Sequence, residues 1–442
     1  MAKSFHEIRD PIHVFVRLDS EERRVLDSRP FQRLRSIHQL ALTYLVYPGA
    51  THKRFEHSLG VMELAGRVYD VVTDANNIER SIEDILPNEG HMRHYWRQVL
   101  RMAALCHDIG HLPFSHGAEK ELLPAGWNHE RLTWDLIFCP EMAGYWQEMK
   151  VQALDIAKLA VGPKKAAEFD TKVTFTAWEA ILSEIIVGDA FGVDRMDYLL
   201  RDSYHAGVTY GRFDHYRLID TLRILPAPPS DTAESTNEPA LGVDIGGIQS
   251  SEALLLARYL MYSQMYMHHV RRIYDKHLQD FLSAWLPDGK FPTDVDSHLA
   301  LTDNEVTAAM LTALRSKKAG EDPLSPLAKR VLCRSHFRLL YARSPDDVKI
   351  NPESGEALYK AAQKEFPSDL IRHDRYSQKG GSPDFPVRMH DGRIVSSISL
   401  SDTLARLPVV STDYIFADKQ ILSKADAWLQ SSKAAIISEG GE

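Results

Sequence analysis

Four residues have side chains that bind metal ions and lie in segments that otherwise look like buried helices. They are His57, His107, Asp108 and Asp194. Neighbouring side chains on a helix diverge by about 100°, so His107 and Asp108 can reach one ion only if their helix ends there, which the Gly and Pro that follow predict. Two imidazoles and two carboxylates suit a borderline divalent ion such as iron, manganese, nickel or zinc. These residues therefore predict a metal centre, and the ligand set leaves the choice of ion open.

The histidine and cysteine contents also point to metal or proton chemistry without thiolates. The chain has 20 histidines and only three cysteines, Cys106, Cys139 and Cys333, which are widely spaced. An odd number of dispersed cysteines indicates neither a disulfide framework nor a thiolate zinc site. Histidine, by contrast, binds metals and exchanges protons near neutral pH.

The candidate ligands lie in longer motifs. These read RFEHSLGV at 54–61, CHDIGHLPFSH at 106–116, NHE at 128–130 and DRMDYLLRD at 194–202. Together they resemble the HD-domain deoxynucleoside triphosphate (dNTP) triphosphohydrolases over residues 8–285, with a weaker likeness beyond. The resemblance implies a mainly α protein, with an HD helical core at 1–290, a loop insertion near 226–240, and a small α+β lobe at 291–442. Because the pattern begins almost at residue 1, we expect no preceding sterile-alpha-motif domain.

The resemblance also assigns catalytic roles. It makes the four residues above the ligands of the catalytic metal, with Mg²⁺ accompanying the triphosphate. It places four further side chains around the phosphates: His111, His116, Glu119 and His129. His116 and Glu119 are three residues apart and would share one face of a helix, so we expect an acid with its orienting carboxylate. For His129 an ordinary hydrogen bond at a helix N-terminus is the alternative.

Substrate contacts follow from the same resemblance. The expected phosphate-binding residues are Arg54, Arg195 and Tyr198, the sugar-binding residues are Gln39, Leu40 and Asp202, and the remaining pocket residues are Arg258 and Tyr266. In the family the apolar residue at position 40 crowds the C2′ atom of the sugar. A ribose hydroxyl is then excluded by its bulk and by burial without a partner, which predicts a preference for deoxynucleotides.

A regulatory site is expected near the N-terminus. Asp27, Gln32 and Arg35 match residues that recognise a guanine nucleotide between subunits in the family. This predicts activation by GTP or a dNTP and a homo-oligomer, a tetramer built as a dimer of dimers. The other interpretation is a surface aspartate that caps a helix entered through Pro30, and the sequence leaves both open.

Charge and hydropathy exclude several classes of protein. The formal net charge is −9, and phosphate neutralisation needs dense basic surface, so nucleic acid is not the expected main partner. No apolar run approaches the roughly 18 residues of a membrane span, and the N-terminus lacks the apolar stretch of a secretion signal. We therefore expect a soluble cytoplasmic protein with no membrane partner.

The predicted function is metal-dependent hydrolysis of a dNTP to a deoxynucleoside and tripolyphosphate. The alternatives are another HD phosphohydrolase acting on a nucleoside monophosphate, a ribonucleotide or an alarmone, a nuclease acting on single-stranded ends, and an inactive nucleotide sensor. Tyr198 with Asp202, and Gln39 with Leu40, favour the first interpretation, because simpler HD phosphatases need no cradle for a triphosphate and a sugar.

Periodicity predicts the elements that must position these groups. Helices are expected at 54–72, 95–107, 178–202 with a break near Gly188 and Gly192, and 252–285 as one long helix. A capping box at Thr302 predicts a further helix. Loops are expected at 226–239, 317–326 and 376–386, and short strands near Val387, 394–395, Ile398 and 414–416.

Overall fold

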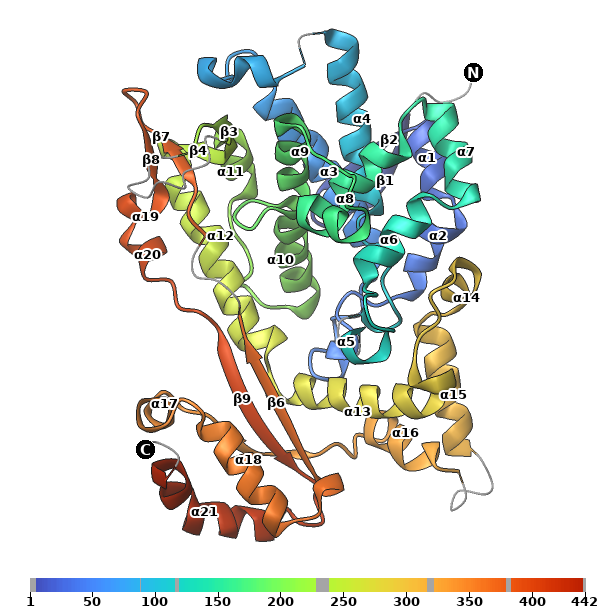
Figure 1. The fold of residues 1–442 in the computed structure, drawn as a ribbon, viewed down its shortest axis with the longest axis vertical. Coiled ribbons are helices and arrows are strands. Elements are labelled where there is room, and N and C mark those ends of the chain that lie inside the picture. The colour runs from blue at the N-terminus through green and yellow to red at the C-terminus, as the bar shows by residue number, and fades with distance from the viewer. Residues whose placement is uncertain are drawn as a thin grey trace. The chain divides into compact units, whose positions relative to one another are not determined.

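The computed structural model describes residues 5–87, 89–115, 119–227, 238–315, 322–378 and 383–439. These residues form a mainly helical protein with three small sheets, which confirms the predicted fold class (Figure 1). Two compact units alternate along the chain. Unit 1 comprises Met1–Met261, Pro292–Asp303 and Gly381–Pro408, and unit 2 comprises Tyr262–Phe291, Asn304–Gly380 and Val409–Glu442. The sequence prediction divides the chain once, at residue 290, whereas each of these units comprises three separate segments of the chain.

Five packed helices form the centre of unit 1: α3 (Arg54–Val72), α4 (Gly90–Cys106), α8 (Ala153–Phe169), α9 (Ala177–Val187) and α10 (Val193–Ala206) (Figure 1). The helix predicted at 54–72 is confirmed, and its periodic apolar residues Leu59, Val61, Leu64, Val68 and Val72 are all buried. The shorter helices of unit 1 are α1 (Ser20–Leu26), α2 (Arg29–Arg33), α5 (Glu119–Leu122), α6 (His129–Ile137), α7 (Pro140–Met149), α11 (His215–Thr221), α12 (Ile248–Met261), α14 (Val295–Ala300), α19 (Ser397–Leu400) and α20 (Asp402–Ala405).

The break predicted between 178 and 202 is confirmed as a turn between α9 and α10. A Cβ atom on Gly192 would lie 2.6 Å from the carbonyl oxygen of Gly188, a separation that side chains do not tolerate, so glycine is required there. The turn places Asp194 in the first turn of α10. Helix α4 begins at Gly90 rather than at the predicted residue 95, and it ends at Cys106, directly before the His-Asp doublet.

Two of the sheets belong to unit 1. An N-terminal hairpin pairs β1 (Phe5–Asp10) with β2 (Val14–Asp19), with Phe5 opposite Asp19. The second sheet has the order β3 (Leu222–Leu225), β4 (Ala240–Asp244), β7 (Pro386–Arg388) and β8 (Ile394–Ser396), in which only β4 and β7 run parallel. The strands near Val387 and 394–395 are thus confirmed, but Ile398 lies in helix α19. Of the predicted 226–239 loop, residues 228–237 lie outside the described residues.

The prediction of one long helix at 252–285 is wrong, because the structure divides this segment into two helices. Helix α12 ends at Met261, a π-helical turn follows at Tyr262–Tyr266, and α13 begins at His269. The predicted loop at 317–326 is also partly wrong, because Pro326 lies within α16. The elements of unit 2 are α13 (His269–Trp285), α15 (Asp303–Arg315, beginning one residue before the unit), α16 (Leu324–Leu332), α17 (Pro345–Ile350), α18 (Ser354–Glu365), α21 (Leu422–Glu439) and the antiparallel sheet β5 (Arg338–Ala342), β9 (Ser411–Ala417) and β6 (Ile371–Ser377). Among the described helices, none is long and apolar enough to cross a membrane.

Candidate metal centre and nucleotide site

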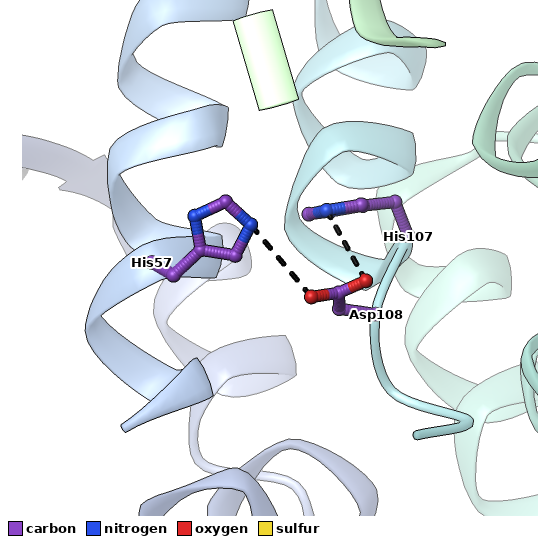
Figure 2. Close-up of side chains that lie close together, drawn as sticks. All are labelled: His57, His107 and Asp108. Carbon is purple, nitrogen blue, oxygen red and sulfur yellow. Dashed lines mark ion pairs between the residues drawn. The ribbon is translucent and has the colours of Figure 1, made fainter. Parts of the chain in front are cut away.

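Two helices and the turn after one of them bring the predicted ligands together. Helix α3 presents His57 from its N-terminal end, and α4 stops at Cys106 so that His107 and Asp108 lie on an irregular segment. Both of these side chains then face His57, as Figure 2 shows. Gly110 allows the segment to pass against α6, because a Cβ there would lie 2.3 Å from the carbonyl oxygen of His129.

The donor atoms of His57, His107 and Asp108 lie within 4.8 Å of one another, and the three side chains are buried. Nε2 of His57 lies 3.7 Å from Oδ2 of Asp108, and Nε2 of His107 lies 3.4 Å from Oδ1 of Asp108 (Figure 2). From α10, Oδ1 of Asp194 lies 3.1 Å from Nε2 of His57 and 3.5 Å from Nε2 of His107. We refer to these four residues as the metal cluster.

An unpartnered nitrogen shows that the cluster fits a cation. Nδ1 of His107 lies 2.8 Å from the carbonyl oxygen of Ala104, so it carries the hydrogen and Nε2 presents a lone pair. That Nε2 is buried and has no hydrogen-bond partner among the described residues. Since buried polar atoms are normally satisfied, and since two imidazoles with two carboxylates suit a divalent transition metal, the cluster can hold such an ion.

The charged groups of the cluster shift one another's pKa values. Burial lowers the pKa of His57, but hydrogen bonds to Asp194 and Asp197 outweigh it and raise the pKa to about 10. Burial raises the pKa of Asp108, whereas Arg54 and the nearby histidines hold it well below its ordinary value. Burial likewise raises the pKa of Asp194, but hydrogen bonds with His107 and His57 lower it below its ordinary value. Asp108 and Asp194 are therefore both ionised at neutral pH, as metal ligands must be.

His111, His129 and Glu119 form a second group of side chains, which contacts the metal cluster through Asp108. Nε2 of His111 lies 3.1 Å from Oδ1 of Asp108, and the His111 ring stacks on His129 with centroids 4.0 Å apart. Oε1 of Glu119 accepts a hydrogen bond from the backbone nitrogen of His129 and pairs with its Nδ1, both at 2.7 Å. His129 is thus one partner of Glu119, whereas the predicted partner His116 lies outside the described residues, so that pairing stays a prediction.

His52, which the sequence analysis did not single out, contacts two of the predicted sugar-binding residues, Gln39 and Asp202. The backbone nitrogen of Gln39 donates to the carbonyl oxygen of His52 at 3.0 Å. Nε2 of His52 in turn pairs with Oδ1 of Asp202 at 2.7 Å, and both side chains are buried. Leu40, next to Gln39, is also buried. Buried Oε1 of Gln39 has no hydrogen-bond partner among the described residues, so it remains able to accept a hydrogen bond.

The predicted phosphate-binding arginines divide into two places. Arg54 donates from Nε to Ser115 Oγ at 2.7 Å and pairs with Asp108, so its charge lies against the metal cluster. Arg195 and Arg258 both pair with Oδ1 of Asp189, at 3.2 and 3.3 Å. Their charges are thus concentrated around the turn that precedes Asp194.

The two predicted tyrosines of the substrate pocket lie on different elements. Tyr198 lies on α10 between Asp194 and Asp202 and is half-buried. Tyr266 belongs to unit 2, where its ring packs edge-on against Tyr262 with centroids 5.1 Å apart.

The proposed activator residues lie around the ends of two short helices. Asp27 caps the C-terminus of α1, is exposed, and pairs with Arg23 at 2.8 Å. Gln32 donates to the carbonyl oxygen of Leu26 and accepts from Nε of Arg35, each at 2.8 Å. Asp27 therefore closes one helix and does not cap the helix that contains Pro30, whose N-cap is Ser28.

Comparison with known proteins identifies the family of the chain. The HD domain family profile matches residues 54–138, and a profile described as the HD associated region matches residues 213–361. A solved structure of a hypothetical protein from Aquifex aeolicus has a TM-score of 0.75 and 30% identity, covering 96% of this chain and all of that one.

The chain belongs to the HD domain family. Among curated HD-type relatives, an uncharacterized protein of Methanocaldococcus jannaschii is 37% identical over 61% of this chain and 47% of its own length. The uncharacterized protein YwfO of Bacillus subtilis is 32% identical over 60% and 52%. The human deoxynucleoside triphosphate triphosphohydrolase SAMHD1 is 28% identical over 82% and 59%. The chain thus spans about half the length of these relatives.

Proposed function

We propose that the protein is a metal-dependent triphosphohydrolase that converts a dNTP into a deoxynucleoside and tripolyphosphate. The observation that carries the proposal is the double role of α10. Its first turn supplies Asp194 to the metal cluster, and two turns later Asp202 meets His52 beside Gln39. A metal site for a phosphate and a polar group suited to a sugar hydroxyl thus lie along one helix. The similarity to SAMHD1, which is named for dNTP hydrolysis, supports the same substrate class.

The metal cluster would hold one divalent ion, of iron, manganese, nickel or zinc, with Mg²⁺ bound to the triphosphate. Such an ion supplies Lewis-acid polarisation of a phosphoryl oxygen and lowers the pKa of water. The chain contributes the orientation, because Ala104 fixes the tautomer of His107 and Arg54 forms an ion pair with Asp108.

In the proposed reaction, a water oxygen attacks the α-phosphorus and the bond between this phosphorus and the sugar 5′-oxygen breaks. The 5′-oxygen then needs a proton. Burial lowers the pKa of His129, but Glu119 and Glu130 raise it above its ordinary value, which favours the protonated form and suits His129 to the role of proton donor. Burial and the charge of Arg54 keep the pKa of His111 well below its ordinary value, so His111 is neutral. His116 stays a predicted acid in the same step.

Substrate selection in this proposal depends on Gln39, Leu40 and Asp202 at the sugar. Arg54, Arg195 and Tyr198 bind phosphates, and Arg258 is a further pocket residue; Tyr266, which belongs to unit 2, stays a predicted pocket residue. Asp27, Gln32 and Arg35 form the proposed activator site for GTP or a dNTP in a tetrameric assembly. Gln32 and Arg35 share a hydrogen bond and so lie side by side on the surface.

A product assay tests the proposal. The purified protein, supplied with Mn²⁺ or Mg²⁺, is incubated with each dNTP, the matching NTP and the matching dNMP, with and without GTP. We expect each dNTP to yield equal amounts of deoxynucleoside and tripolyphosphate, and we expect no such products from the NTPs or the dNMPs. Release of orthophosphate or of a dNMP would contradict the reaction, and equal turnover of NTPs would contradict the sugar selection. Hydrolysis of the dNMP would favour the alternative HD phosphatase.

A further inference from the structure

A buried carboxylate holds His57 on the side opposite the metal cluster. Nδ1 of His57 lies 2.8 Å from Oδ2 of Asp197, three residues after Asp194 on α10, and Asp197 is fully buried. An ionised carboxylate can only accept hydrogen bonds, so the hydrogen must sit on Nδ1. Nε2, which faces Asp194 and Asp108, is therefore the nitrogen whose proton a bound metal ion would replace.

Asp197 is in turn fixed by two other buried side chains. Its Oδ1 lies 2.7 Å from Nε2 of His13, and Arg201 donates to both of its oxygens at 2.8 Å. Arg201 also donates to Oδ2 of Asp10 at 2.8 Å. Oδ1 of Asp10 accepts from the backbone nitrogens of Ile12 and His13, both at 2.8 Å. The turn of the β1–β2 hairpin is thus two side chains away from a metal ligand.

The contact between α3 and α10 is built to admit this network. Gly60 lies one turn after His57 on α3, and a Cβ atom there would lie 1.9 Å from Oδ1 of Asp197 and 2.4 Å from Arg201. Any larger residue would displace the carboxylate. Glycine is otherwise unfavourable within a helix, so its presence here is explained by the close approach of Asp197.

We propose that Asp197 and His13 are positioning residues of the metal centre. Asp197 fixes the tautomer and ring orientation of His57, and His13 fixes Asp197, so that the N-terminal hairpin contributes to metal affinity. The inference rests on the proposed role of His57 as a metal ligand. Hydrogen-bond partners of metal-binding histidines change metal affinity by about 10- to 100-fold when they are removed.

The test is Mn²⁺ binding by the full chain, measured after chelator treatment from the electron paramagnetic resonance signal of the free ion. The variants are Asp197→Asn, His13→Ala and His13→Gln, whose amide nitrogen can replace Nε2 of His13. The matched control is Glu22→Gln. Glu22 is a buried carboxylate of the same unit and accepts from Arg101 at 2.5 and 3.0 Å, away from the metal cluster.

We expect Asp197→Asn to weaken Mn²⁺ binding by about 10-fold or more. His13→Ala should also weaken it, His13→Gln should restore it, and Glu22→Gln should lower the unfolding temperature while leaving Mn²⁺ binding within about twofold. If Asp197→Asn does not fold, the two His13 variants decide. Wild-type affinity in folded Asp197→Asn or in His13→Ala overturns the inference, and so does an equal loss of affinity in Glu22→Gln.

Failure of the inference is distinguishable from failure of the proposed function. Tight Mn²⁺ binding that is lost in Asp197→Asn, together with no hydrolysis of any dNTP, supports the inference and refutes the proposed function. Hydrolysis of dNTPs by the wild type, with unchanged Mn²⁺ affinity in the Asp197 and His13 variants, refutes the inference alone.

Discussion

Replacing Glu184 with Gln tests how the turn that delivers Asp194 is built. Glu184 lies on α9 one turn before Gly188, and its Oε2 accepts a hydrogen bond from the backbone nitrogen of Leu241 in β4 at 3.2 Å. Burial raises the pKa of Glu184 from 4.5 to about 7, although the hydrogen bond from Leu241 opposes the change. The folded protein therefore favours the protonated carboxyl group.

The sign and size of the effect follow from linkage. Because the pKa is higher in the folded state, the wild type loses stability as the pH rises from 4.5 to 7. The separation of about 2.5 between the folded and unfolded pKa values corresponds to about 3 kcal/mol when the carboxyl group is fully ionised. The same relation gives a penalty of about 1 kcal/mol at pH 5 and about 3 kcal/mol at pH 8. Gln stays neutral and keeps an oxygen acceptor for Leu241.

Urea denaturation at pH 5 and pH 8 measures this effect, with each variant compared with the wild type at the same pH. The free energy of unfolding of Glu184→Gln, measured relative to the wild type, should increase by about 2 kcal/mol when the pH rises from 5 to 8. Glu179 on the same helix is the matched control. Burial raises its pKa, but hydrogen bonds from Lys158 and Thr176 lower it below the ordinary value of 4.5, so Glu179→Gln should lose stability to a similar extent at pH 5 and pH 8. A Glu184→Gln effect that is the same at both pH values would refute the reasoning.

Three further predictions concern the site. His107→Ala should lose bound Mn²⁺ and hydrolysis together, whereas His94→Ala, exposed on the preceding helix α4, should keep both. Metal analysis with a rate assay checks this, and bound metal in His107→Ala would contradict it. Leu40→Ala should reduce the kcat/KM preference for dATP over ATP by about 10-fold or more, and an unchanged ratio would contradict the sugar selection. Leu42→Ala, equally buried, should leave that ratio unchanged. Asp202→Asn should remove the preference for dATP over its 3′-deoxy analogue, and a retained preference would show that Asp202 does not bind the 3′-hydroxyl.

The helical elements that carry the site could be predicted, because amphipathic periodicity and glycine positions are local signals. The pattern at 54–72 and the break at Gly188 and Gly192 both reappear in the structure. The apolar content of 252–285 concealed a π-helical turn at Tyr262–Tyr266, which periodicity does not encode. The hairpin β1–β2 was not predicted, since its strands are short and largely exposed.

The metal cluster could be predicted from residue types, whereas the groups that orient it could not. His52, Asp197 and His13 are joined to their partners only by contacts between distant segments. One local signal was available for Asp197, because it precedes Arg201 by four residues and the pair therefore shares a face of α10. The partner of Glu119 predicted from helical spacing, His116, lies outside the described residues, whereas the contact of Glu119 with His129 at the start of α6 was not predicted.

Hydrolysis of a dNTP in ¹⁸O-labelled water, followed by ³¹P nuclear magnetic resonance and mass spectrometry of the products, tests the central claim most directly. Attack of water on the α-phosphorus predicts tripolyphosphate that carries one ¹⁸O on a terminal phosphorus, together with an unlabelled deoxynucleoside. Pyrophosphate or orthophosphate as the first product, or ¹⁸O in the deoxynucleoside, would contradict the proposed reaction.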